Sequence, residues 1–325
     1  MIIVTGGAGF IGSNLVNELN KRNNYNIIIC DTANSKLKKN YLKKIKYKTI
    51  ISPSVFFNFL KKNKKKIKYI LHLGAISATT SSNFSKLLKN NLEFSIKVLN
   101  FCNKNKTGLI YASSASTYGN GSCGFKDSEN YNYLSKLKPL NLYGKSKHLF
   151  DLHISKKIKK EGKLQFQCIG LKFFNVYGNN ERHKKKQMSI ISYLAPLINK
   201  NKKIKLFKSH NKKFKDGEQK RDFIHVSDCI NVILWFYKNK KISGLFNVGT
   251  GSARTFLDIT KNLFNQLNKK EKIEFINTPK NIRKHYQYFT KANIDKLIKC
   301  GYRKKFKNIE DGIKLFVEEN KDDYK

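Results

Sequence analysis

The amino-acid sequence predicts an α/β fold with a doubly wound parallel sheet and a smaller α/β domain toward the C-terminus. In the first half of the chain, short apolar segments alternate with longer amphipathic ones, as in a parallel sheet that is covered by helices on both faces. The first apolar segment runs directly into a glycine-rich turn at 6–12. After residue 174 the alternation becomes irregular, which predicts the second domain.

Strands are expected where short apolar runs are bounded by polar or glycine residues, and helices where apolar residues recur every three to four positions. Leu142, Leu149 and Ile158 show this helical spacing. The predicted strands are 2–5, 27–30, 69–73, 108–114 and 166–174, and the predicted helices lie near 11–22, 85–103 and 142–160. The later segments 221–229 and 244–251 are expected to return to the sheet.

Composition excludes several classes of protein. The 325 residues are 40% hydrophobic, which allows a large core. The longest apolar runs fall far short of the roughly 20 residues that span a bilayer, and the N-terminal residues do not resemble a signal peptide. Six widely spaced cysteines without a CxxC pair argue against zinc and disulfide frameworks. We expect a cytoplasmic protein with buried free thiols, no metal and no membrane partner.

The net charge of +44 has two explanations. It is compatible with nucleic-acid binding, and also with mutational drift toward A/T-rich codons, which encode Lys, Asn and Ile. The chain has 60 Lys but 6 Arg, whereas Arg supplies the bidentate geometry that reads bases and phosphates. Lysine runs such as 61–68 are also spread along the chain. We favour drift, and expect non-specific polyanion binding without a specific nucleic-acid partner.

The turn at 6–12 carries the strongest functional signal. Gly6, Gly9 and Gly12 give the spacing G-x-x-G-x-x-G between a strand and a helix. Glycine lets the backbone approach a pyrophosphate, and the helix N-terminus attracts its negative charge. These features predict a Rossmann-type dinucleotide site. The expected division is a dinucleotide-binding domain at 1–172, with late returns at about 222–248, interleaved with a substrate-binding domain at 173–325.

Asp31 ends the second predicted strand, 19 residues after Gly12. An acidic residue there accepts a hydrogen bond from the adenine ribose 2′-hydroxyl of NAD. Lys36, Lys38 and Lys39 follow closely and would instead neutralise the 2′-phosphate of NADP. These residues by themselves leave the choice between NAD and NADP open.

The segment "NLYGKSK" contains Tyr143 and Lys147, a candidate acid/base pair. The spacing alone is uninformative, because Tyr237 and Lys241 share it. The first pair follows Ser114, which ends a predicted strand at the edge of the sheet where ligands bind. Free Tyr has a pKa of about 10, and a nearby ammonium would lower that pKa toward the working range. The serine hydroxyl would hold the substrate oxygen that gains or loses the proton.

These elements resemble the extended short-chain dehydrogenase/reductases that act on nucleotide-sugars. A narrower resemblance, to the ADP-heptose 6-epimerases of lipopolysaccharide core synthesis, covers residue 1 to about 318. It rests on "MIIVTGGAGFIGSN", "YASSASTYG", "PLNLYGKSKHLFD", "FFNVYGNNERHKK", "KRDFIHVSD", "FNVGTG" and "HYQYFT".

The resemblance implies that C6 of ADP-D-glycero-D-manno-heptose is oxidised transiently to a ketone and reduced again on the opposite face, which gives the L-glycero epimer. It also implies one tightly bound NADP per subunit, with NAD less expected, and a homopentamer.

The resemblance further assigns roles to individual residues. Tyr143 matches the first acid/base and Lys184 the second, with Lys185 or Lys186 as alternatives because this segment is one residue longer than the family pattern. The implied catalytic residues are Ser114, Tyr143, Lys147 and Lys184. The implied cofactor contacts are Gly6, Gly9, Phe10, Ile11, Gly12, Asp31, Thr32, Lys38, Leu73, Gly74, Ala75, Ile76, Ser77, Asn90, Lys147, Val176 and Lys184. The implied substrate contacts are Ser114, Asn175, Gln187, Phe207, Lys208, Ser209, His210, Arg221 and Tyr286.

Two positions depart from the family pattern. Leu194 stands where a substrate-contacting His is common, and Gln187 where a Ser or Arg is common.

A 4,6-dehydratase would have an Asp-Glu pair after the strand-end Ser, but Ser114 is followed by "ASTY". A 4-epimerase needs only the Tyr, so a role for Lys184 would separate the two epimerases. A non-catalytic NADP-binding protein would have lost Ser114, Tyr143 and Lys147.

Overall fold

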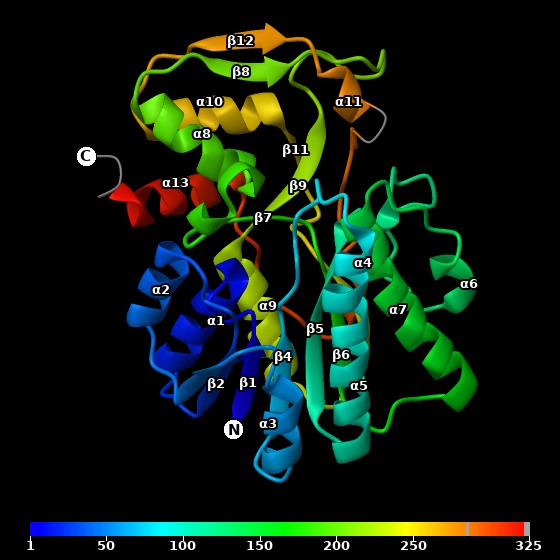
Figure 1. Cartoon of the computed structure of the whole chain (residues 1–325). Helices are drawn as coiled ribbons and strands as arrows, with labels where there is room; N and C mark the ends of the chain where they lie inside the picture. The colour runs from blue at the N-terminus through cyan, green and yellow to red at the C-terminus, as the bar shows by residue number, and fades with distance from the viewer. Residues whose placement is uncertain (284–285, 322–325) are drawn as a thin grey trace.

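A computed structural model describes residues 1–283 and 286–321. Its largest sheet has seven strands in the order β10-β6-β5-β4-β1-β2-β3, and all neighbouring pairs are parallel (Figure 1). The chain begins in the middle of the sheet, builds outward through β2 and β3, and then crosses back to β4 on the other side of β1. Such a reversal creates a crevice at the carboxyl ends of the strands. The strands are β1 (Ile2–Thr5), β2 (Ile27–Cys30), β3 (Thr49–Ile51), β4 (Tyr69–His72), β5 (Gly108–Ser114), β6 (Cys168–Phe173) and β10 (Gly244–Val248).

Helices cover both faces of this sheet because successive strand side chains point to opposite sides. Ile2 and Val4 of β1 pack in a core with α1 and α9, whereas Ile3 packs in a second core with α3, α5 and α7. Both faces are therefore buried, which explains the nearly continuous apolar strands. The helices around the sheet are α1 (Phe10–Lys21), α2 (Lys36–Lys43), α3 (Phe56–Asn63), α5 (Phe94–Asn105), α7 (Leu142–Glu161) and α9 (Val226–Lys238).

A smaller unit lies beyond the carboxyl ends of the large sheet (Figure 1). Its third core contains Leu194 and Ile198, which pack with Phe264 and Ile313. It contains the paired strands β8 (Ile204–Phe207) and β12 (Ile273–Ile276), the three-stranded sheet of β7 (Asn175–Tyr177), β9 (Lys220–His225) and β11 (Ala253–Thr255), and the helices α8 (Ile190–Asn199), α10 (Phe256–Gln266) and α13 (Ile309–Glu319).

Short elements complete the described chain. They are α4 (Phe84–Leu87), the π-helical segment η1 (Leu88–Glu93), the 3₁₀ segments η2 (Ala115–Tyr118) and η3 (Arg182–Gln187), α6 (Tyr131–Leu134), α11 (Lys280–Arg283) and α12 (Asp295–Lys299). Within the described residues, no helix is both long enough and apolar enough to cross a membrane.

The structure agrees with most of the predicted elements and corrects three expectations. The segment 244–251 returns to the large sheet as β10, but 221–229 does not, because β9 pairs with β7 and β11 in the smaller unit. The sequence reading also missed β3, which is only three residues long. Four of the six cysteines are buried free thiols as expected, whereas Cys123 and Cys300 are exposed. The exact division at residue 172 stays a prediction.

Candidate active site

The glycine turn between β1 and α1 forms the floor of a cavity of about 470 Å³ at the carboxyl ends of the strands. A side chain at Gly12 could not fit, because its Cβ would lie 2.1 Å from the Gly6 carbonyl oxygen. The turn can therefore pack closely only with glycine at this position. Helix α1 begins at Phe10, and its N-terminus lies at the cavity. This cradle suits the pyrophosphate of a dinucleotide, both sterically and through the helix dipole.

All of the cofactor contacts that the resemblance implies line this single cavity, although they come from segments far apart in the sequence. They follow β1, β2, β4, β5 and β6 in turn, so the parallel sheet brings them to one edge. Ser114, Tyr143 and His183 line the same cavity. The sequence reading missed other lining residues, namely Thr5, Cys30, Asn34, Pro53, Phe94, Ala112, Ser113, Phe173, Phe174 and His183.

Asp31 and Lys38 form one ion pair at the end of β2, with 3.0 Å between Lys38 Nζ and Asp31 Oδ1. Asp31 Oδ1 also accepts from the Ala33 amide, and Oδ2 accepts from the Ala8 amide, each at 3.1 Å. The carboxylate is buried and tied to the glycine turn. Its charge is compensated by the lysine, so the ribose end of the cavity presents an acceptor and a cation together.

The candidate catalytic residues meet where β5 ends and α7 begins. Asn141 caps α7 by accepting a hydrogen bond from the Gly144 amide at 2.7 Å, which fixes Tyr143 in the first turn. Gly144 allows close packing, because a Cβ there would lie 2.7 Å from the Ser116 carbonyl oxygen. Tyr143 thereby reaches hydrogen-bonding contact with Ser114. Lys147, one turn further, donates to the Ala112 carbonyl oxygen at 2.9 Å.

Burial controls the titration of this pair. It raises the pKa of Tyr143, and the hydrogen bond with Ser114 opposes that rise. It also lowers the pKa of Lys147 to about 8, which the Asp151 carboxylate opposes. The expectation that Lys147 brings the Tyr143 pKa below its ordinary value is therefore wrong for this structure: desolvation outweighs any such attraction, and the Lys147 ammonium is directed at Ala112.

A buried ion pair lies behind these residues. The Lys172 ammonium of β6 is 2.8 Å from Asp151 Oδ2, and neither side chain is exposed. Ser113 Oγ and Tyr111 OH also donate to this carboxylate, at 2.7 and 3.1 Å. The sequence reading did not identify this group. Asp151 lies four residues after Lys147, so both lie on one side of α7. This spacing could have suggested from the sequence that Asp151 lies near the catalytic candidates.

Lys184, in η3, also lines this cavity. Its ammonium is 2.8 Å from Glu181 Oε1 and 5.1 Å from the centre of the Phe10 ring. Lys185 is exposed and does not line the cavity, and the side chain of Lys186 lies outside the described part of the structure. Of the two lysines whose side chains the structure describes, Lys184 lines the cavity and Lys185 does not.

The expected substrate residues lie in the smaller unit. Arg221 of β9 is buried between the rings of Phe256 and Tyr286, 5.8 and 5.7 Å from their centres. Burial lowers its pKa to about 10, and its side chain forms no ion pair with a carboxylate of the described residues. A buried guanidinium without an anionic partner is suited to a bound anion.

Aromatic rings extend this group. Tyr286 lies 6.2 Å from Phe207 and 6.0 Å from His210, measured between ring centres. Tyr288, which the sequence reading left without a role, accepts from the His210 amide through its hydroxyl group at 2.8 Å. The main chains of Lys208 and Ser209 are held by Ile276 and Asp216. These residues form a platform next to Arg221.

Two further positions complete the predicted set. Gln187 donates to Thr80 Oγ1 at 3.1 Å, and Asn175 is exposed in β7. None of the expected substrate residues except Ser114 lines the cavity described above. Leu194, the departure from the family pattern, is buried in the core of the smaller unit. Its side chain therefore contributes to packing and is not placed to contact a ligand.

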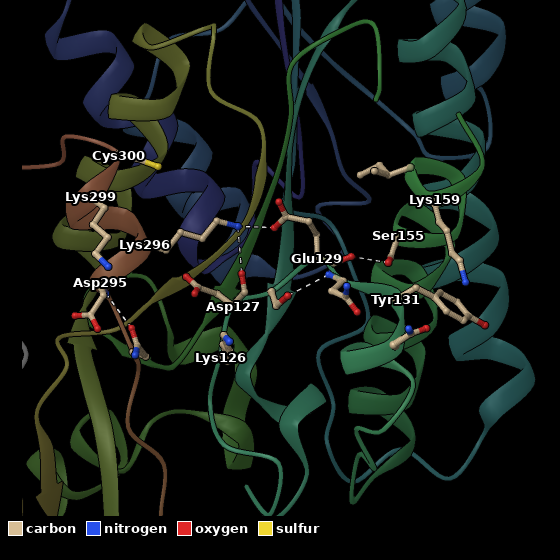
Figure 2. A pocket seen from close by; sticks show the side chains of 15 residues that line it. Lys126, Asp127, Glu129, Tyr131, Ser155, Lys159, Asp295, Lys296, Lys299 and Cys300 are labelled. Atoms are coloured by element: carbon tan, nitrogen blue, oxygen red, sulfur yellow. Dashed lines mark hydrogen bonds and ion pairs between the residues drawn. The ribbon is translucent and has the colours of Figure 1, made fainter. Parts of the chain in front are cut away.

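A larger cavity of about 850 Å³ lies between the 126–132 segment, α7 and α12 (Figure 2). Lys296 pairs there with Glu129 and donates to the Asp127 carbonyl oxygen at 3.2 Å. Ser155 Oγ donates to the Glu129 carbonyl oxygen at 2.6 Å. None of the predicted site residues lines this cavity, and its central polar groups are paired with one another. The catalytic candidates belong to the smaller cavity.

Comparisons with known proteins agree with this arrangement. Residues 2–249 match the NAD dependent epimerase/dehydratase family. The ADP-L-glycero-D-manno-heptose-6-epimerase of Fusobacterium nucleatum is 40% identical, and that of Brachyspira hyodysenteriae 39%; each alignment covers 98% of this chain and 97% of the relative.

Solved structures give the same picture. The ADP-L-glycero-D-manno-heptose-6-epimerase of Helicobacter pylori has a TM-score of 0.77 and 28% identity, and the alignment covers 98% of this chain and 95% of that one. The UDP-N-acetylglucosamine 4-epimerase of Methanobrevibacter ruminantium has a TM-score of 0.81 at 22% identity, with 98% and 96% covered. At that identity the second likeness supports the fold alone.

Proposed function

Because the chain belongs to the NAD dependent epimerase/dehydratase family, we propose that it converts ADP-D-glycero-D-manno-heptose into its L-glycero epimer at C6. Relatives of that name align over nearly their whole length. The observation that carries the proposal is the position of Tyr143 and Lys184 at one cavity, on different elements. Inversion at a hydroxyl-bearing carbon through a ketone needs a proton acceptor for one epimer and a proton donor for the other.

Tyr143 is the proposed first acid/base. Its phenol contacts Ser114, so both groups would meet the C6 oxygen, with Ser114 holding it while Tyr143 takes the proton. The raised pKa of Tyr143 means that the phenolate needs a nearby positive charge. Lys147, one helical turn away, is the proposed source: its pKa of about 8 leaves it largely protonated at neutral pH, and its ammonium would have to turn from the Ala112 carbonyl oxygen toward the phenol.

Lys184 is the proposed second acid/base. It would return the proton to the C6 oxygen after the sugar has turned. A nicotinamide dinucleotide bound on the glycine turn would supply the oxidation at C6 and its reversal. The sequence alternative of a 4-epimerase has no use for Lys184, so the placement of this residue favours the 6-epimerase.

Arg221 and the rings around it are the proposed site for the ADP part of the substrate. Its guanidinium, which has no carboxylate partner among the described residues, suits the diphosphate, and Tyr286 with Tyr288 offers aromatic faces to the base. Anchoring the nucleotide there would leave the heptose free to turn between Tyr143 and Lys184. Such rotation is required if the same bound cofactor acts on both faces of C6.

The identity of the cofactor is a finer proposal. We infer NADP, tightly bound with one per subunit, because Lys38 stands beside Asp31 and offers a cation to the 2′-phosphate. Titration calorimetry of the cofactor-free protein with NADP and NAD tests this. Lys38→Ala is expected to weaken NADP binding by tenfold or more and NAD binding by less than threefold; equal loss of both would contradict the inference.

The resemblance also motivates three broader proposals: a homopentamer, a cytoplasmic location and a role in lipopolysaccharide core synthesis. Sedimentation equilibrium of the purified protein tests the first of these, and a monomer or dimer would contradict it.

The activity itself is tested by incubating purified protein with ADP-D-glycero-D-manno-heptose and no added cofactor, and by following the sugar by proton NMR. The L-glycero epimer is expected to appear, and Tyr143→Phe is expected to slow its formation by roughly 10²–10⁴-fold. An unchanged sugar, even after NADP or NAD is added, would refute the proposal. UDP- and dTDP-hexoses run in parallel would then reveal a 4-epimerase.

A further inference from the structure

Glu181 is a buried carboxylate directly before η3, with only 1% of its surface exposed. Both of its oxygens accept two hydrogen bonds. Oε1 accepts from Lys184 Nζ and from the Ser189 amide, each at 2.8 Å. Oε2 accepts from Ser189 Oγ at 2.7 Å and from Ser192 Oγ at 2.8 Å. A fully satisfied buried carboxylate of this kind fixes the positions of its donors.

These contacts join both ends of the segment that carries Lys184. On one side, the Lys184 amide donates to the Glu181 carbonyl oxygen at 3.0 Å. On the other side, Ser189 caps α8, and Ser192 lies in the first turn of that helix. Between them the chain bends at Lys185, whose φ of +52° is unusual for a residue other than glycine. The Glu181 carboxylate thus closes a loop whose backbone would otherwise be free to relax this strain.

Glu181 also sets where the Lys184 ammonium lies. Lysine has four rotatable side-chain bonds and loses much conformational entropy when it is fixed. The Phe10 ring holds the ammonium from one side through a cation–π contact, which by itself is weak. The short ion pair with a buried carboxylate is the stronger restraint. Together the two contacts keep the ammonium beside Phe10, at the start of α1, where both residues line the cavity.

We propose that Glu181 is a positioning residue for the second proton transfer, and that it holds the Lys184 ammonium where the C6 oxygen of one epimer arrives. This inference rests on the proposed function. A carboxylate is needed because all four contacts are donors. In Glu181→Gln, the amide NH₂ group would face at least one of these donors, and either Lys184 or the serines would be displaced.

The decisive experiment separates the two halves of the reaction. Each epimer is given separately to the holoenzyme, and the absorbance of reduced nicotinamide is followed in the first turnover. Lys184→Met is expected to abolish reduction by one epimer and to spare the other, which Tyr143 serves. Glu181→Gln is expected to slow the reaction of that same epimer tenfold or more and to leave the other within about twofold.

The controls distinguish positioning from general damage. Glu310→Gln is a matched substitution at a surface ion pair with Arg254. It should leave the reaction rates of both epimers unchanged. Ser192→Ala removes one contact of Glu181 but not the one to Lys184, and should spare both half-reactions. The double variant Glu181→Gln/Lys184→Met should be no slower than Lys184→Met. Equal slowing with both epimers, or additive loss in the double variant, would overturn the inference.

A second readout does not depend on turnover. Limited acylation of the free amines, followed by peptide mass spectrometry, reports how firmly each lysine is held. Lys184 should be labelled several-fold faster in Glu181→Gln than in the wild type, while the exposed Lys185 serves as an internal reference. Unchanged labelling of Lys184 would overturn the inference even if the proposed activity is confirmed. Faster labelling in a protein that acts on neither epimer would show that Glu181 holds the Lys184 ammonium, and that it is the proposed function which fails. Should Glu181→Gln not fold, Glu181→Asp, which shortens the side chain, takes its place.

Discussion

Tyr143 and Lys147 carry pKa shifts of opposite direction that have the same main cause, desolvation by burial. Burial favours the neutral form of both, so that the tyrosine holds its proton more tightly and the lysine more loosely. The polar partners Ser114 and Asp151 oppose these shifts. The pair is therefore balanced between desolvation and local polarity, as is common for groups that exchange protons during catalysis.

The shifted Lys147 makes folding stability depend on pH in a defined window. Its pKa is about 8 in the folded chain and about 10.5 for an ordinary lysine in water, so between these values the unfolded state binds more protons. Stability then rises with pH. Relative to Lys147→Met, the wild type should gain about 3 kcal/mol between pH about 8 and about 10.5. Urea unfolding of both proteins across this range measures the stability of the wild type minus that of the variant, and a value that stays constant or falls with pH would contradict the shift.

Sequence reasoning worked for residues whose spacing is fixed by one turn or one helix. Gly6, Gly9 and Gly12 lie in a single turn, and Tyr143 and Lys147 in a single helix, so their geometry follows from local backbone structure. It failed for Lys172 and Glu181, whose partners are set by packing between distant segments. The choice between Lys184 and Lys185 also needed the structure, because the chain bends at Lys185, and Lys184 lines the cavity while Lys185 is exposed.

The start of α7 places the proposed catalytic residue Tyr143, and one capping contact defines that start. Asn141→Ala should destabilise the protein by about 1 kcal/mol, and should also lower turnover because Tyr143 lies two residues after the cap. Asn308 caps α13 in the same way, accepting from the Asp311 amide at 2.7 Å.

Asn308→Ala is therefore the matched control for this prediction. It should cost similar stability in urea unfolding but leave the turnover of folded enzyme unchanged. Equal effects of the two substitutions on turnover would mean that the cap of α7 has no special role at the site.

Secondary structure was predictable for the elements of the large sheet, since buried parallel strands are apolar runs and their connecting helices are amphipathic. The strand pairing of the smaller unit was not predictable in this way. Its strands are short and pair across long intervals, as β8 does with β12 and β9 with β11. Nothing in the local sequence specifies these partners, which is why 221–229 was expected in the wrong sheet.

The positive charge is distributed unevenly over the fold. The segments that precede the strands carry 19 Lys or Arg and one carboxylate, whereas those that follow the strands carry one Lys and three carboxylates. Parallel topology places the first set at one edge of the sheet and the second set at the other. The preceding segments are 21–26, 44–48, 61–68, 104–107, 159–167 and 238–243; the following ones are 6–9, 31–35, 52–55, 73–83, 115–130 and 249–252.

This crowding of like charges should weaken the folded state at low ionic strength. The melting temperature is expected to rise with added NaCl as the lysines are screened. Lys64→Gln/Lys66→Gln, at the crowded edge, should raise the melting temperature in low salt by on the order of 1 °C. Lys270→Gln/Lys272→Gln, which flanks Glu271, should not. A melting temperature that is independent of salt would contradict this account.

The central claim is inversion at C6 through oxidation and return of the same hydrogen. Proton NMR of ADP-D-glycero-D-manno-heptose, incubated with the enzyme in D₂O, tests it most directly. We predict that the L-glycero epimer appears with protium still at C6, because the hydrogen never exchanges with solvent. Deuterium at C6 of the product would contradict the mechanism, and the absence of any epimer would contradict the function.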